Sequence, residues 1–115
     1  MLSAADIRAL ALALPLAEEA PHFEATSFRV KGKIFATMGE EAGRVTLKFD
    51  PEDQHNLSEA HPGVIAPVEG YWGRSGWTTV AFGGLDPDLV ATLLRMSWAR
   101  VAPKRLLNTV GGDDA

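Results

Sequence analysis

The sequence predicts an α+β domain in which helices pack on one face of an antiparallel sheet. Apolar residues recur at helical spacing near both ends of the chain, and between them residues 26–49 alternate apolar and polar side chains. Such alternation is typical of strands that are buried on one face only. The 115 residues fit a single domain, expected over residues 1–110 and followed by a frayed tail at residues 111–115.

The first helix is expected near the start of the chain. Ser3 followed by Asp6 resembles a capping arrangement, in which a hydroxyl and a carboxylate bind free backbone N–H groups. The apolar residues at helical spacing are Ile7, Leu10, Ala11 and Leu14. Pro15 ends this helix because it disfavours the helical conformation of the residue before it. Residues 18–23 then form a short strand or an extended link, and Pro21 restricts such a strand to a sheet edge.

Residues 26–49 are predicted to form a hairpin with a turn near residues 40–43. Successive side chains of a strand point to opposite faces, so one face of this hairpin is apolar. The other face carries five cations and one ring, namely Arg29, Lys31, Lys33, Arg44, Lys48 and Phe35. The segment holds five basic residues against two acidic ones, a charge of +3. Since the whole chain carries −4, the remainder carries −7.

Two further helices are predicted to begin at Asp-Pro pairs, Asp50-Pro51 and Asp86-Pro87. In each pair the carboxylate can cap the helix and the proline suits its first position. The last helix has one apolar stripe, consisting of Leu89, Val90, Leu93, Leu94, Ser97, Trp98 and Val101. Between these helices, residues 77–82 are predicted to be a strand. A glycine-punctuated loop precedes it and carries Tyr71, Trp72 and Arg74.

The uncovered sheet face provides the candidate site. Trp77 has the parity of that face, and Arg74 lies in the loop before it. Cations neutralise phosphates and rings stack on exposed bases, which favours a nucleic-acid surface. The predicted contact residues are Arg29, Lys31, Lys33, Phe35, Arg44, Lys48, Arg74 and Trp77. A solvated or partner-covered sheet explains the same alternation, because Lys on sheet edges also prevents aggregation.

No pattern in the sequence indicates a reaction, a cofactor or a metal. The chain has no cysteine, which excludes thiolate chemistry and is compatible with a cytoplasmic location. His22, His55 and His61 are too irregularly spaced for a metal set, and Ser75 has no base near it. No apolar stretch approaches the roughly 20 residues of a membrane span. The sequence pI near 5.3 means that any nucleic-acid binding must come from a local patch.

A series of short motifs covers nearly the whole chain. In order, they are Leu14-Pro15, Glu18-Glu19, the run from Phe28 to Ala36, Leu47-Lys48, Gly76-Trp77, Ser97-Trp98, Val101 and Pro103-Lys104. Their order and spacing resemble the MmcQ/YjbR-like family of small bacterial proteins. The resemblance implies a CyaY-like, or frataxin-like, α+β fold and a DNA-binding function with no defined catalytic residues. The positions that match the family's basic hairpin are Arg29, Lys31, Lys33 and Lys48.

Two functions therefore stay open. The first is a non-enzymatic, cytoplasmic module that binds DNA by contacting the sugar-phosphate backbone of the DNA. The second is a module that uses the same face for a protein partner, self-association or a small ligand, with Phe35, Trp77 and the Tyr71–Trp72 loop in contact. An enzyme is the least favoured interpretation, because the sequence shows no convergent set of titratable groups.

Overall fold

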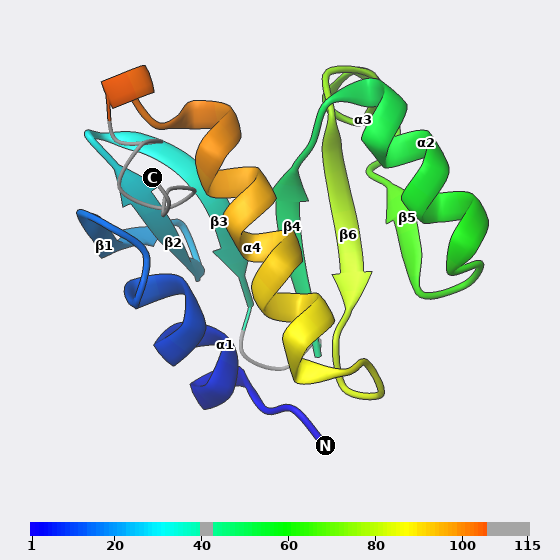
Figure 1. The fold of residues 1–115 in the computed structure, drawn as a ribbon, viewed down its shortest axis with the longest axis horizontal. Helices are drawn as coiled ribbons and strands as arrows, with labels where there is room; N and C mark the ends of the chain where they lie inside the picture. Colours follow the sequence, from blue (N-terminus) through cyan, green and yellow to red (C-terminus); the bar gives the residue numbers. More distant parts are fainter. Residues whose placement is uncertain (40–42, 106–115) are drawn as a thin grey trace.

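The computed structural model describes residues 1–39 and 43–105 (Figure 1). Its elements are α1 (Ala4–Leu12), β1 (Ala17–His22), β2 (Ala25–Val30), β3 (Lys33–Met38), β4 (Arg44–Lys48), α2 (Pro51–Ala60), β5 (Ile65–Pro67), α3 (Tyr71–Arg74), β6 (Trp77–Ala81) and α4 (Pro87–Val101). The predicted tail, and most of the predicted turn at residues 40–43, lie outside the described residues.

The strands form one antiparallel sheet with the order β1-β2-β3-β4-β6-β5. The predicted α+β class is thereby confirmed. Pro21 lies in β1 and Pro67 in β5, which are the two edge strands of this order. Proline is tolerated there because one side of an edge strand needs no ladder hydrogen bonds.

The helices begin as the sequence predicts. The Ser3 hydroxyl accepts a hydrogen bond from the Asp6 N–H, and the Asp6 carboxylate accepts one from the Ser3 N–H, so the capping box is complete. These bonds to Ser3 lower the pKa of Asp6. Asp50 and Asp86 each accept a hydrogen bond from the N–H two residues further on, and a proline follows each of them.

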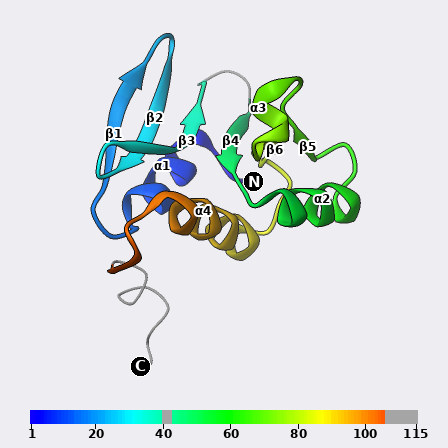
Figure 2. The same cartoon turned by 90° about the horizontal axis from the view of Figure 1, so that it is seen from above.

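The long helices share one side of the sheet. Figure 2 shows α2 and α4 on that side, and α4 crosses β3 and β4. The core lies between these layers and includes Ile7, Phe28, Val45, Leu47, Leu94 and Trp98. The Trp98 indole N–H donates to the Pro15 carbonyl at 3.0 Å, which joins the last helix to the segment after α1. The opposite side of the sheet is called the open face below.

A β-bulge interrupts the pairing of β2 with β3. Phe28 pairs with Ala36, whereas Arg29 pairs with Ile34, so Phe35 is an extra residue on β3. A bulge breaks the alternation of faces, and both Phe35 and Ala36 are fully buried. The prediction that Phe35 lies on the open face is therefore wrong, because its side chain belongs to the core.

A two-residue turn joins β2 to β3. Val30 pairs with Lys33, which leaves Lys31 and Gly32 as the turn. Their φ angles are 53° and 81°, and two positive angles are typical of the type I′ turn that connects hairpin strands. The segment predicted as one hairpin thus contains three strands. Lys31 adopts a left-handed conformation that glycine or asparagine adopts at lower energy.

Ser97 of α4 bridges β3 and β4 next to the bulge. Its hydroxyl accepts a hydrogen bond from the Lys48 N–H at 2.8 Å and donates one to the Phe35 carbonyl at 2.5 Å. The direct register between the two strands stops one residue earlier, at Ala36 and Leu47. The hydroxyl therefore satisfies two backbone groups at the place where the ladder ends.

We expect Ser97→Ala to lower the free energy of unfolding by about 1–3 kcal/mol, because it leaves two buried backbone groups without their partner. Urea denaturation measures this loss. Thr92→Ala is the matched control on the same helix, since the Thr92 hydroxyl donates to the Asp88 carbonyl within the helix itself. If Ser97→Ala lowers the free energy of unfolding no more than Thr92→Ala does, the bridging role of Ser97 is contradicted.

An ion pair joins α1 to the edge strand β1. The Arg8 guanidinium donates to the Glu19 carboxylate at 2.9 and 3.1 Å, and the Thr26 hydroxyl donates to it at 2.8 Å. These hydrogen bonds, that from Arg8 foremost, lower the pKa of Glu19.

The stabilisation due to Glu19 should depend on pH. A carboxyl group whose folded-state pKa lies below its unfolded value contributes stability above the unfolded pKa, and this contribution is lost as the pH falls through the folded value. Glu19→Gln should therefore be less stable than the parent near pH 7, and the difference should shrink below about pH 4.5. Thermal unfolding across pH 3 to 7 measures it, with Glu18→Gln as the charge-matched control. If the stability difference between Glu19→Gln and the parent stays constant from pH 3 to 7, it does not arise from the charge of Glu19.

Candidate nucleic-acid interface

The open face has a central row of small side chains. The strand register aligns one residue from each strand in this row, which consists of Ala20, Ser27, Thr37, Thr46, Thr79 and Ala66. Neighbouring strands are about 4.8 Å apart, so the row spans about 24 Å. Because these side chains are short, an extended partner can approach close to the sheet.

Three of the predicted cations flank this row. Arg44 and Lys48 lie two residues to either side of Thr46 on β4, and Arg29 lies two residues after Ser27 on β2. A separation of two residues keeps side chains on the same face of a sheet. Glu18 pairs with Arg29 across the first two strands and adds one negative charge. The open face is therefore positively charged around a neutral row.

Arg29 lies flat against the β1–β2 hairpin. Its Nε donates to the Ser27 hydroxyl at 2.9 Å, and one Nη donates to the Pro21 carbonyl at 3.3 Å. The Ser27 hydroxyl in turn donates to the Ala20 carbonyl at 2.8 Å. Ser27 is fully buried, although it is on the face that the long helices leave open. The Arg29 guanidinium is thus a charge held in a fixed position.

Lys48 and Trp77 form a pair on the open face. They are directly opposite each other in the β4–β6 register, and both are half-buried. The Lys48 ammonium lies 5.7 Å from the centre of the Trp77 ring, within the range of a cation–π interaction. The structure therefore brings together two of the predicted site residues.

The other predicted cations lie at one end of the sheet. Lys31 and Lys33 are exposed at the β2–β3 turn. Val30 is buried on the helix side and pairs with Lys33. The register therefore places Lys33 on the helix side, whereas the sequence predicted it on the open face. Arg74 is exposed just before β6. Antiparallel pairing places these positions and Lys48 at the same end of the strands.

We call this set of cations the basic end; it comprises Arg29, Lys31, Lys33, Lys48 and Arg74. Lys104 and Arg105 are exposed after α4, in the orange segment that Figure 1 shows at the same end of the molecule. The sequence did not place them in the site, because their position depends on the direction in which α4 crosses the sheet. Arg44 is at the opposite end of β4.

Acidic residues also lie near the basic end, at the start of α2. These are Asp50, Glu52 and Asp53. Asp50 is 3.6 Å from an Nη of Arg100, and this ion pair offsets its charge. The helix α2, at whose start these residues lie, packs on the opposite side of the sheet from the open face (Figure 2).

The predicted loop before β6 contains the one-turn helix α3, which lies on the opposite side of the sheet from α2 and α4 (Figure 2). Tyr71 and Trp72 are 66% and 61% exposed. Their ring centres are 5.6 Å apart with an angle of 73° between the rings, an edge contact. We call these two side chains the aromatic platform. They were in the predicted loop but not among the predicted nucleic-acid contacts.

Two glycines fix the backbone of α3. A Cβ atom at Gly73 would lie 1.7 Å from the Val68 carbonyl oxygen, and one at Gly76 would lie 2.1 Å from the Phe49 carbonyl oxygen. Gly76 also has a φ of 111°, which side chains rarely allow. The main chain of this segment is therefore packed directly against other main chain.

Gln54 of α2 holds the same segment from the helix side. Its side chain is buried, and its amide nitrogen lies 2.9 Å from the Gly73 carbonyl and 3.1 Å from the Trp77 carbonyl. The same nitrogen is 3.0 Å from the hydroxyl of Thr78. The backbone that carries the aromatic platform thus has a defined position relative to β6.

Phe23 is a further strongly exposed aromatic ring. It is 95% exposed at the β1–β2 turn, with a φ of 57° and an edge contact to His22 at 4.8 Å. The register places this turn at the end of the sheet opposite to Lys48 and Trp77. Phe23 is therefore remote from the basic end.

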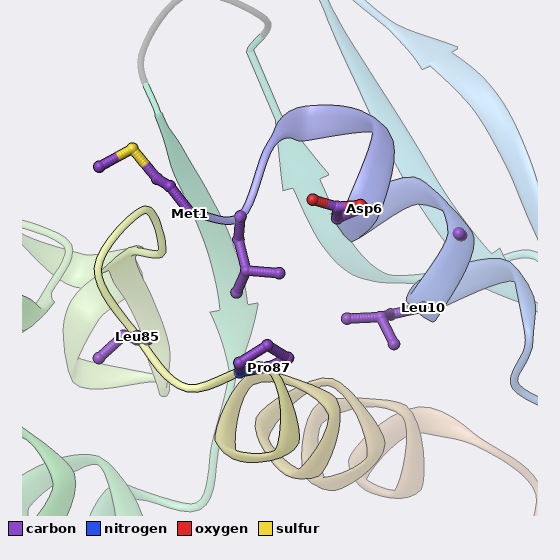
Figure 3. A pocket seen from close by; sticks show the side chains of 7 residues that line it. Met1, Asp6, Leu10, Leu85 and Pro87 are labelled. Atoms are coloured by element: carbon purple, nitrogen blue, oxygen red, sulfur yellow. The ribbon is translucent and has the colours of Figure 1, made fainter.

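A pocket of about 420 Å³ lies between α1 and the start of α4 (Figure 3). Its lining residues are Met1, Leu2, Asp6, Ala9, Leu10, Leu85 and Pro87. The carboxylate in this lining is engaged in capping α1.

In the part of the chain that the structure describes, no cluster of three His, Cys, Asp or Glu side chains is arranged to hold a metal ion. Within the same residues, no helix is long and apolar enough to cross a membrane.

Comparison with known proteins agrees with the motif order. The YjbR family model matches residues 12–100. The crystal structure of Deinococcus radiodurans protein DR2400, assigned to the domain family DUF419, is similar with a TM-score of 0.75 and 30% sequence identity. The similarity covers 99% of this chain and 83% of that one. A comparison with curated proteins gives no match. The chain belongs to the YjbR family.

Proposed function

We propose that this protein is a non-enzymatic, cytoplasmic module that binds nucleic acid with its open face and basic end. The observation that carries the proposal is the Lys48–Trp77 pair, which combines a cation and a ring on the side of the sheet that the long helices leave open. A phosphate can contact the ammonium while the ring offers an apolar surface beside it. The resemblance to the family's basic hairpin supports the same assignment.

The arrangement favours contacts with the nucleic-acid backbone. Lys31 and Lys33 are exposed at a turn, Lys48 lies on the face, and Arg74 lies before β6 at the same end of the sheet. Charges at such positions neutralise phosphates without reading base edges. The row of small side chains lets the backbone approach. Binding should therefore depend little on sequence and strongly on salt.

The titratable groups support a non-enzymatic role. Asp6 and Glu19 have lowered pKa values, and both have structural partners: Asp6 caps α1, and Glu19 pairs with Arg8. The absence of cysteine fits a reducing compartment and supports the cytoplasmic location in the proposal.

A second candidate function is an interaction with a protein or a small ligand through the same face. The exposure of the aromatic platform favours it, because exposed rings often bury against a partner. Self-association through Trp77 is its most direct form. Light scattering from dilute to concentrated solution should then show a mass increase that Trp77→Ala abolishes. A constant monomer mass would remove the self-association form.

The nucleic-acid function predicts a specific response to charge reversal. Lys31→Glu/Lys33→Glu and Lys48→Glu should each weaken the binding of labelled DNA and lower the slope of log K against log salt by about one for each lost phosphate contact. Fluorescence anisotropy at low and moderate salt measures both effects. Arg95→Glu is the matched control, because Arg95 is exposed on α4, which covers the opposite side of the sheet.

Two results would contradict this function. The first is no binding by the parent protein at low salt. The second is equal weakening by Arg95→Glu and Lys48→Glu, which would indicate a response to net charge rather than to the open face.

A further inference from the structure

We infer that the nucleic acid bound at the basic end is single-stranded, with its bases stacked on the aromatic platform and its phosphates against Lys48 and Arg74. This inference rests on the proposed function and names its substrate class.

The first step is the rigidity of α3. Close main-chain packing at Gly73 and Gly76, together with the buried Gln54 amide, fixes a single helical turn. The two largest side chains of that turn, Tyr71 and Trp72, nevertheless remain mostly exposed. A rigid support with exposed rings is the arrangement that stacking requires, because little order is lost when a base binds.

The second step is the position of the cations. Arg74 follows Tyr71 by three residues, so the two side chains are neighbours on the surface of the turn. The Phe49 N–H donates to the Gly76 carbonyl at 2.9 Å, which places the end of β4, with Lys48, beside the segment that leaves α3. Positive charge thus lies within the chain segment that links the platform to Trp77, at Arg74, and beside its end, at Lys48.

The third step is the exclusion of a duplex. The faces of paired bases are covered by their neighbours in the stack, so rings can stack only on bases that are unpaired or at an end. A duplex would use the cations alone and would gain nothing from Tyr71 and Trp72. Because the chain carries a net charge of −4, stacking is a contact that complements weak electrostatic attraction.

The experiment compares one 20-nucleotide oligothymidylate with a 20-base-pair mixed-sequence duplex, both labelled, at the same salt concentration. Trp72→Ala and Tyr71→Ala should each weaken binding of the single strand about tenfold and leave duplex binding within twofold of the parent. Trp72→Phe should recover part of the loss, because it keeps a ring. Phe23→Ala is the control, since it removes a ring that is more exposed than Tyr71 or Trp72 and lies at the remote end of the sheet.

Trp72→Ala should also leave the salt slope unchanged, whereas Lys48→Glu should lower it. Urea denaturation of each variant verifies folding, and removal of the exposed Tyr71 or Trp72 ring should alter stability little. If the duplex binds more tightly than the single strand, or if ring removal has no effect, the inference is wrong while the proposed function stands. If neither nucleic acid binds at low salt, both are wrong.

Discussion

The β-bulge at Phe35 is the constraint on which both faces of the sheet depend. The Lys31–Gly32 turn fixes one end of β3, and the pairing of Ala36 with Leu47 fixes its position against β4. Without an extra residue in β3, these two registers cannot both be met, since a shift of one residue would move every side chain of β3 to the other face of the sheet. The extra residue resolves the conflict, and it lets β2 place Arg29 on the open face while β3 buries Phe35 in the core.

Local rules explain most of the elements that the sequence predicted. Capping by Ser3, Asp50 and Asp86 needs only residues within one helical turn, and Pro21 restricts its strand to an edge. These signals act over a few residues, and the structure confirms them. The α+β class follows from the same information, because the helical and alternating patterns occupy different parts of the chain.

Two failures of prediction, the bulge in β3 and the helix α3, have a common physical cause, which is contact between residues that are distant in sequence. At the bulge, the Phe35 carbonyl accepts a hydrogen bond from Ser97, which is 62 residues further on. In α3, the Gly73 carbonyl accepts one from Gln54, which is 19 residues earlier. Neither partner is visible from local alternation. The turn at Lys31 was missed for a different reason: lysine is uncommon where φ is positive, so the residue type gave no signal for a turn.

These contacts also explain how an acidic chain can offer a local positive site. Charges separated by more than about 8 Å in solvent are largely screened at physiological ionic strength, so the net charge matters less than the groups within that distance. Strand pairing places Lys48 opposite Trp77, and the fixed backbone of α3 keeps Arg74 at the same end. Stacking on rings is not screened by salt. A site that combines nearby cations with rigid rings therefore tolerates the distant acidic residues that would weaken binding by charge alone.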